Sequence, residues 1–336
     1  MKNQSGNIRK NVPGSELLWD RNVLIGLRKY GEDKIMSLMA KILYHGFKLT
    51  GLKKMFALPQ EEFIKKVNKI NEKRGFFIPK DHKFHYEEQV VLEKYSCLVI
   101  RQNEKPSKKA ILFFFGGGMM IGPDQVDVSY AGKICKATGC DVWFPFYPLC
   151  TEHCITETYA MAYECYKKMI EIYGGGNIST SGLSSGGALA LGIAAHNNAQ
   201  SNPLPAPYHI VVSSPGECPH NDAERKRMQE LSPRDVCVDY KFMFYEDQYM
   251  RHGNENVPEY MLSGSFGDYS GVHDIHFFYS EDEVLYAAAP YFEEACKRSN
   301  VPYTMSVRKG MVHCYVMAPF FRKAKEDFRR MIDFLK

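Results

Sequence analysis

One serine in this sequence has the neighbours that a nucleophile needs. Ser184 stands at the centre of a Gly-x-Ser-x-Gly segment that runs from Gly182 to Gly186. A β-prone run, Asn177 to Thr180, precedes this segment, and an Ala/Leu-rich helical run follows it. The glycines permit a sharp strand-to-helix turn that exposes the serine hydroxyl. A flexible glycine turn would show the same pattern, so the function depends on what the rest of the chain supplies.

Three consecutive glycines could supply backbone donors for a reaction at such a serine. Gly116, Gly117 and Gly118 directly follow an apolar run, Ala110 to Phe115, that predicts a strand buried on both faces. Glycines leave backbone N–H groups uncovered, and acyl transfer needs such fixed donors to stabilise a tetrahedral oxyanion. The N–H of Ser185, just after the serine, would add another donor. A tight turn alone is the competing interpretation of these glycines.

A histidine must lie near the serine, because a hydroxyl attacks a carbonyl well only when a base takes its proton. The sequence has 11 histidines, and His313 is the best placed because it falls in a loop between the last predicted strand and the last predicted helix. His273 and His276 fall within a predicted strand, which favours a packing or surface role for both. We therefore expect His313 to be the general base.

The remaining requirement is a carboxylate that holds the histidine. Three consecutive acids, Glu281, Asp282 and Glu283, come directly after a predicted strand that ends at Tyr279. A solvated turn or a helix cap would also use such acids, and the residues alone do not choose among them. The order serine, acid, histidine along the chain fits a nucleophile turn of this kind.

Length and composition describe an ordinary globular protein with room for a large core. The chain has 336 residues, of which 45% are hydrophobic and 24% charged, and its net charge is +4. It could fold as one large domain or as one domain with a cap. The basic residues form short groups among acids, such as Lys53-Lys54 and Arg225-Lys226-Arg227, so we expect no nucleic-acid partner.

The cysteines and the apolar runs indicate where in the cell the protein is expected and whether it needs a metal. The 10 cysteines occur without an apolar signal segment at the N-terminus, which favours free thiols and a cytoplasmic protein. No cysteines have the C-x₂-C spacing of a zinc site, so we expect no structural metal. The chemistry above needs no cofactor, and none is expected. No apolar run reaches the ~20 residues that a membrane span requires.

The order of the predicted elements favours a doubly wound, mostly parallel α/β sheet. Residues 1–80 look helical, with one helix over Lys34–Leu49 and another that opens at Pro59. After them, short β-prone runs alternate with helical runs, up to a final helix over Pro319–Leu335. We therefore predict a helical cap or lid over residues 1–80 and an α/β domain over residues 81–336. Within that domain, residues 215–268 should form a partly helical excursion over the sheet.

Several segments together resemble the hormone-sensitive-lipase-like group of α/β-hydrolases over most of residues 80–336. The segments that carry the resemblance are Phe115–Gly118 for the group's H-G-G-G, Gly182–Gly187 for its G-D-S-A-G-G, Phe146–His153 for its Y-R/P-L-A-P-E-H, and Gly267–Gly271, Ser280–Leu285 and Gly310–His313. The resemblance implies an α/β-hydrolase fold with an N-terminal helical cap. It also implies a carboxylesterase or acetyl esterase activity that uses no cofactor.

Carried over position by position, the resemblance gives each candidate residue a role. Ser184 becomes the nucleophile and His313 the general base and acid. The group's acid falls two residues before a leucine, which selects Glu283, with Asp282 as the alternative. The backbone donors of the oxyanion hole become Gly116, Gly117 and Ser185. A small or medium acyl ester is then the substrate. Members of the group often dimerise through the last strand and helix, so a homodimer is a further expected partner.

A small-molecule-binding protein is the alternative function. Some relatives of the group act as receptors after they lose the triad histidine, and Phe115 in place of the group's polar residue suggests a relaxed catalytic demand. The complete set of Ser184, Glu283 and His313 favours the hydrolase over the receptor.

Two apolar residues stand where the group has polar ones, namely Phe115 for histidine and Leu183 for aspartate. We hypothesise that apolar packing replaces a hydrogen-bonded brace of the glycine loop, so that turnover falls by a factor of about 10–10³. The double substitution Phe115→His, Leu183→Asp should then raise kcat for p-nitrophenyl acetate above that of the parent chain. Equal kcat values would contradict the hypothesis.

Overall fold

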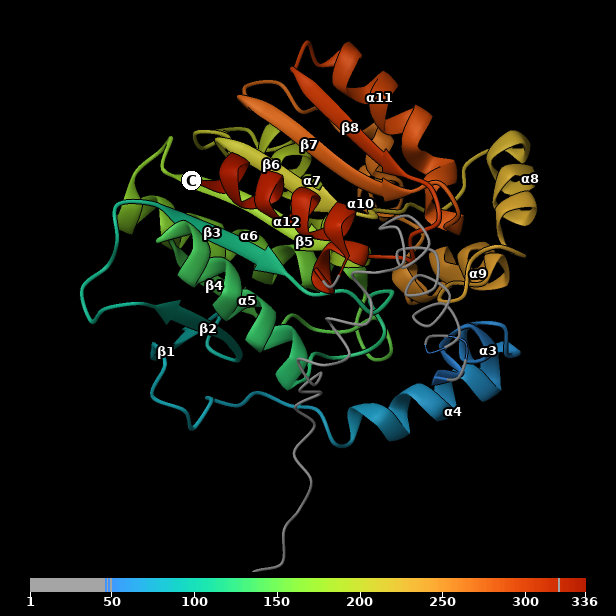
Figure 1. Cartoon of the computed structure of the whole chain (residues 1–336), viewed down its shortest axis with the longest axis horizontal. Coiled ribbons are helices and arrows are strands. Elements are labelled where there is room, and N and C mark those ends of the chain that lie inside the picture. The colour runs from blue at the N-terminus through green and yellow to red at the C-terminus, as the bar shows by residue number, and fades with distance from the viewer. Residues whose placement is uncertain (1–45, 47, 49, 320) are drawn as a thin grey trace, which may run out of the picture.

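An eight-stranded sheet forms the centre of the computed structural model, which describes residues 46, 48, 50–319 and 321–336 (Figure 1). The strands are β1 (His85–Val91), β2 (Tyr95–Arg101), β3 (Ala110–Phe114), β4 (Asp141–Pro145), β5 (Ile178–Leu183), β6 (His209–Ser213), β7 (Asp274–Ser280) and β8 (Tyr303–Arg308). Their order is β1-β2-β4-β3-β5-β6-β7-β8; β2 is antiparallel to both of its neighbours, β1 and β4, and all other neighbouring strands are parallel. β3 and β5 lie where the sequence predicts strands, over Ala110–Phe115 and Asn177–Thr180.

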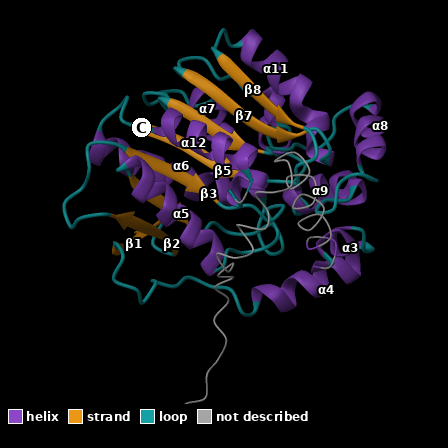
Figure 2. Ribbon diagram, viewed as in Figure 1, coloured by secondary structure: helices purple, strands orange, loops and turns teal. Residues whose placement is uncertain are grey.

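Helices cover both faces of this sheet, with α5 and α12 on one face and α6 and α7 on the other (Figures 1 and 2). The α-helices are α3 (Leu52–Phe56), α4 (Gln60–Asn71), α5 (Gln125–Thr138), α6 (Ile155–Tyr173), α7 (Ser185–Asn198), α8 (Asp222–Leu231), α9 (Tyr240–Arg251), α10 (Glu259–Leu262), α11 (Ala289–Arg298) and α12 (Arg322–Leu335). Short 3₁₀ turns are η1 (Gly264–Phe266), η2 (Val284–Ala288) and η3 (Tyr315–Met317). Among the described residues, none of these helices combines the length and apolar character needed to cross a bilayer.

The central strands of the sheet form the core of the protein. Every residue of β3, β4 and β5 is buried, as expected for strands that helices cover on both faces. The helical segment that follows Glu283 begins as the 3₁₀ turn η2. The regular helix α11 then starts at Ala289 because Pro290, which lacks an N–H, fits only the first turn.

The segment over residues 215–268 is partly helical, as predicted, and comprises α8, α9, α10 and η1. The N-terminal helices α3 and α4 pack against it: Phe56 and Phe63 lie with ring centroids 4.8 and 5.3 Å from Phe242 of α9. Lys53 of α3 donates to the backbone carbonyls of Ser232 and Asp235 in the same segment. The predicted helix over Lys34–Leu49 lies almost entirely outside the described residues, and the division at residue 80 stays a prediction.

A buried aspartate fastens the last helix to the sheet edge. Asp327 of α12 is 0% exposed. It accepts bonds from Arg308 Nε at 2.6 Å and Nη2 at 2.7 Å, and from the Tyr315 hydroxyl at 2.8 Å. Because Arg308 ends β8 and Tyr315 begins η3, one carboxylate joins three elements. A planar guanidinium held at two atoms fixes orientation as well as distance.

Replacing this carboxylate should be costly. We expect Asp327→Asn to lower the free energy of unfolding by about 3 kcal/mol, because the partly buried Arg308 guanidinium would lose its bidentate partner and keep only Glu326 at 3.9 Å. Asp333→Asn on the same helix is the matched control; its side chain is 69% exposed, and loss of its pair with Lys336 should cost about 0.5 kcal/mol or less. Urea unfolding of both variants measures the difference, and equal losses would contradict the account.

Candidate active site

Ser184 occupies a strained backbone position between β5 and α7. Its φ of 54° and ψ of −128° are unusual for a residue with a side chain, and such conformations cost about 1–3 kcal/mol. The Ser184 N–H donates to the Ser213 carbonyl at the end of β6 at 2.9 Å, and α7 begins at the next residue. The serine predicted from the sequence pattern therefore sits at a sharp strand-to-helix turn beside the carboxyl ends of neighbouring strands.

The glycines on both sides of Ser184 are required by close backbone contacts. A Cβ atom added to Gly182 would lie 2.1 Å from the Gly186 carbonyl oxygen. One added to Gly186 would lie 2.2 Å from the Phe115 carbonyl oxygen. No real side chain fits at such distances, so the turn, the start of α7 and the end of β3 approach one another only because both positions lack a Cβ.

The glycine loop after β3 lies directly against the serine. A Cβ built on Gly116 would be 3.1 Å from the Ser184 Cβ, which places the loop in contact with the turn. Gly117 has a φ of 131°, in the region that favours glycine. The predicted oxyanion-hole residues Gly116, Gly117 and Ser185 line the same cavity as Ser184. Ser185 is also the first residue of α7, where backbone N–H groups lack helical partners.

Aromatic packing holds the residue that precedes the glycines. Phe115 is fully buried and stacks on Tyr147, with ring centroids 4.1 Å apart and planes at 4°, and on Phe144 at 5.6 Å. The Tyr147 hydroxyl donates to the Phe115 carbonyl at 2.8 Å. Apolar contacts thus occupy this position together with one hydrogen bond to the backbone. The effect of Phe115 and Leu183 on turnover stays a prediction.

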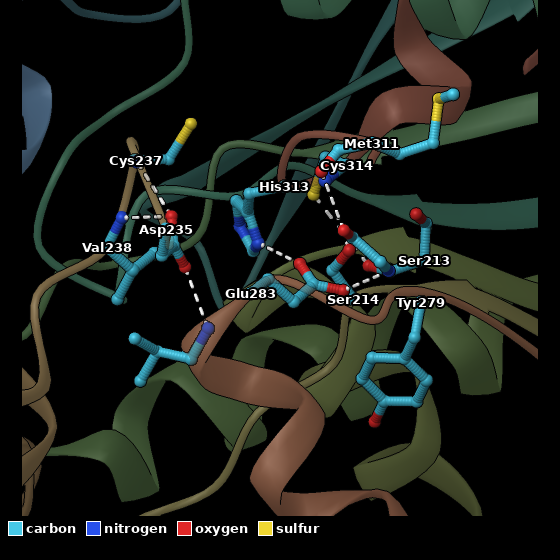
Figure 3. A network of polar contacts seen from close by, with 12 residues as sticks. Ser213, Ser214, Asp235, Cys237, Val238, Tyr279, Glu283, Met311, His313 and Cys314 are labelled. Atoms are coloured by element: carbon cyan, nitrogen blue, oxygen red, sulfur yellow. Dashed lines mark hydrogen bonds and ion pairs between the residues drawn. The ribbon is translucent and has the colours of Figure 1, made fainter. Parts of the chain in front are cut away.

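His313 and the buried Glu283 form a hydrogen-bonded pair (Figure 3). His313 Nδ1 lies 2.6 Å from Glu283 Oε2, and Glu283 Oε1 accepts the Ser280 N–H at 2.7 Å. Because Nδ1 is engaged with the carboxylate, Nε2 is the ring nitrogen available for proton transfer. His313 lines the same cavity as Ser184, so the structure brings the serine and the imidazole to one space.

Asp282, the alternative acid, has other partners. Its Oδ2 accepts the Gly310 N–H at 2.8 Å, and its Oδ1 pairs with Arg234 at 3.0 Å. Asp282 therefore anchors the loop that leads to His313, whereas Glu283 contacts the imidazole itself.

Two residues that the sequence analysis did not single out support this pair. Buried Asp235 accepts the Cys237 and Val238 N–H groups at 2.7 and 3.0 Å, and its Oδ2 accepts the Val284 N–H at 2.8 Å (Figure 3). It thereby fixes the residue next to Glu283. Ser214 Oγ accepts the N–H of Cys314 at 3.0 Å and holds the residue after His313. The local turn at Asp235 is visible in the sequence as an acid after Ser-Pro-Arg, but its contact with Val284 is not.

The electrostatic surroundings favour a proton on His313. Burial opposes charge on the imidazole, but the contacts with Cys314 and the Glu283 carboxylate outweigh burial and raise the pKa of His313 well above its ordinary value of 6.5. An imidazolium in this place would be stabilised, as a base that receives a proton during a reaction requires.

The cavity has a volume of about 360 Å³ and is mostly apolar. Leu52 and Phe56 of α3 and Met243 of α9 line it, so the N-terminal helices and the 215–268 segment form its roof. Two buried acids, Glu217 and Glu246, also line it, and burial raises the pKa of each to about 8. Both acids therefore retain protons near neutral pH, in keeping with apolar surroundings.

Two clusters that could hold a metal ion occur in the described part of the chain, and one of them includes the cavity-lining Glu217. The two groups are His209, Asp274 and His276, and Glu217, His220 and Glu224. Neither contains Ser184, Glu283 or His313.

Comparison with known protein families decides the classification. Residues 111–317, more than half of the chain, match the model of a family described as having the α/β hydrolase fold. The chain belongs to this family. The α/β-hydrolase fold expected from the sequence is confirmed, and the matched region of this hydrolase includes the serine turn, the glycine loop and the loop of His313.

Solved structures with the same fold include several esterases. EstE5, in a crystal soaked with p-nitrophenyl butyrate, has a TM-score of 0.71 at 18% identity, covering 88% of this hydrolase and 97% of that chain. An esterase from the bacterial hormone-sensitive lipase family has a TM-score of 0.71 at 19% identity, covering 88% and 96%. A putative esterase from Staphylococcus aureus has a TM-score of 0.68 at 21% identity, covering 81% and 90%. Among curated proteins, no sequence matches this chain.

Proposed function

We propose that this α/β hydrolase is a serine carboxylester hydrolase for small to medium acyl esters. The observation that carries the proposal is the 2.6 Å bond between His313 and Glu283, in a cavity that Ser184 also lines. A buried carboxylate, an imidazole and a hydroxyl on a strained turn are the groups that nucleophilic acyl transfer uses. Similarity in fold to esterases, one of them studied with p-nitrophenyl butyrate, supports the same reaction class.

In the proposed mechanism, Ser184 Oγ attacks the ester carbonyl while His313 Nε2 takes its proton. The C–O bond to the alcohol then breaks, and the imidazolium gives that proton to the leaving oxygen. Glu283 stays ionised, holds the ring through Nδ1 and stabilises its positive charge. Water, activated by His313 in the same way, attacks the acyl-enzyme, releases the carboxylic acid and regenerates Ser184.

The charge that develops on the carbonyl oxygen needs fixed donors. We assign this role to the N–H groups of Gly116, Gly117 and Ser185, which line the cavity beside Ser184. Backbone donors of this kind are each worth about 10²–10³ in rate. The steps use only groups of this chain, the ester and water. An apolar cavity of about 360 Å³ suits a short or medium acyl chain.

The cytoplasm is the location that we propose, since the ten cysteines, all within the described residues, are free thiols. A homodimer through β8 and α12 is a further proposal, based on the resemblance described above.

Substituting the proposed catalytic residues one at a time should show how much each contributes to kcat. We expect Ser184→Ala to lower kcat for p-nitrophenyl butyrate by a factor on the order of 10⁴–10⁶, and Glu283→Gln by about 10³–10⁴. Asp282→Asn is the matched control next to Glu283; it should stay within about tenfold of the parent because Asp282 contacts the loop and not the imidazole.

Release of nitrophenol measures these rates, and a fluorophosphonate probe should label the parent but not Ser184→Ala. A folded parent chain that neither turns over the ester nor reacts with the probe would refute the hydrolase and favour the small-molecule-binding alternative. Equal losses for Asp282→Asn and Glu283→Gln would refute the assignment of Glu283.

The rate should also depend on pH through His313. Only the neutral imidazole can accept the serine proton, and its pKa is raised, so kcat/KM should increase with pH to a midpoint above 6.5. Glu283→Gln removes the charge that stabilises the imidazolium and should move the midpoint of its residual activity to lower pH. Profiles of kcat/KM between about pH 5 and 10 test this. A parent midpoint below 6.5, or one that the substitution leaves in place, disagrees with the proposed environment.

A further inference from the structure

A polar cluster lies at the ends of β6 and β7 where these strands begin, opposite the ends that carry Ser184 and His313. His209 and Asp274 are the first residues of β6 and β7 and are direct partners in the parallel register. His276 follows Asp274 by two residues, so both side chains lie on the same face of the sheet. His276 in turn is paired with Thr304 of β8.

The side-chain atoms of this cluster converge. His209 Nδ1 lies 2.5 Å from Asp274 Oδ1, and His276 Nε2 lies 3.1 Å from the same oxygen. One ligand atom from each of the three residues lies within 4.8 Å of the others. Two imidazoles and one carboxylate are ligands that Zn²⁺ commonly takes in proteins.

His276 provides the observation that separates this cluster from an ordinary polar network. The residue is only 4% exposed, yet its Nε2 has no hydrogen-bond partner. The atom is close to Asp274 Oδ1 but is not aligned with it for an N–H···O bond. Buried polar nitrogens are nearly always satisfied, so this one needs an explanation. His209 Nδ1 is hydrogen-bonded to Asp274 Oδ1, so the unsatisfied atom of the cluster is His276 Nε2, for which a metal ion would be a partner.

We propose that His209, Asp274 and His276 bind Zn²⁺. The bonds between zinc and its ligand atoms are about 2.0–2.2 Å long, so the three atoms need to move apart only slightly to surround an ion. The side chains of His209 and Asp274 are 17% and 21% exposed, which gives an ion access and leaves room for water as a fourth ligand.

The surroundings of His276 allow the ring form that a metal needs. Its Nδ1 lies 2.8 Å from Thr304 Oγ1, and a hydrogen bond donated from Nδ1 leaves the lone pair on Nε2, which faces the cluster. Phe334 stacks flat on the imidazole, with centroids 3.4 Å apart and planes at 6°. Phe334 belongs to the last turn of α12.

Zinc at this place joins the beginnings of two adjacent strands. A ligand that binds the folded chain and not the unfolded chain stabilises the fold in proportion to the logarithm of its concentration. The site lies at the opposite end of the sheet from Ser184, so we expect stability to change and the rate of ester cleavage to stay the same. This inference does not rest on the proposed function.

The experiment titrates Zn²⁺ into the tag-free full chain after removal of metals with a chelator. Calorimetry should show one ion per chain, and saturation should raise the thermal unfolding midpoint. His209→Gln should weaken binding by at least about tenfold and abolish the stabilisation. His220→Gln, at the second cluster, is the matched control and should leave both unchanged. The same affinity in His209→Gln and the parent, or no binding to the parent, overturns the proposal.

A second variant tests the geometry without removing a ligand. Thr304→Val keeps the shape of the side chain but removes the hydroxyl that orients His276, and should weaken zinc binding by about 10–100-fold. Unchanged affinity in this variant would count against the proposed ring orientation. Co²⁺ serves as a spectroscopic probe, since imidazole and carboxylate ligands give no thiolate charge-transfer band. Such a band would place the ion on the cysteines instead and refute the site.

Discussion

The close approach of three backbone segments around Ser184 is the constraint on which the rest of this structure depends. The end of β3, the turn after β5 and the start of α7 touch where no Cβ could fit, at Gly182 and Gly186. This contact brings the glycine loop against the serine and holds Ser184 in a strained conformation. The strain persists because packing on both sides of the sheet over-determines the turn. The core of fully buried strands is therefore the support of the site as well as the source of stability.

Much of this arrangement could be predicted from short-range patterns. The wholly apolar run at β3, the glycines around Ser184 and the alternation of strands and helices each reflect local rules, and the structure places β3 and β5 as expected. The choice between Asp282 and Glu283 is harder to predict, because the two acids are adjacent in the sequence and differ mainly in the direction in which their side chains point. It depends on how the ends of β7 and β8 face each other, which the resemblance to a family suggested and which the residues alone left open.

Some contacts between distant residues had no signal in the sequence. Asp235 supports the residue after Glu283 across 49 positions of sequence, and no spacing rule connects them. The cluster of His209, Asp274 and His276 could not be predicted either. It contains no cysteine, so cysteine spacing does not indicate it, and it forms only because β6 and β7 pair in this register. His276, expected to pack or to lie at the surface, is buried with an unsatisfied nitrogen. In each case the contact depends on the three-dimensional arrangement of the chain, which the amino-acid composition does not determine.

The bonds of Asp327 have a consequence for how this chain matures. Tyr315, two residues after His313, is held by an aspartate of α12, and that helix also covers part of the sheet over β6 and β7. Translation proceeds from the N-terminus, so α12 is synthesised after every other described element. A nascent chain can fold its serine turn early, yet the histidine loop lacks its final support until α12 has left the ribosome. The histidine loop therefore gains this support only after α12 has been made, whereas most of the core can form before it.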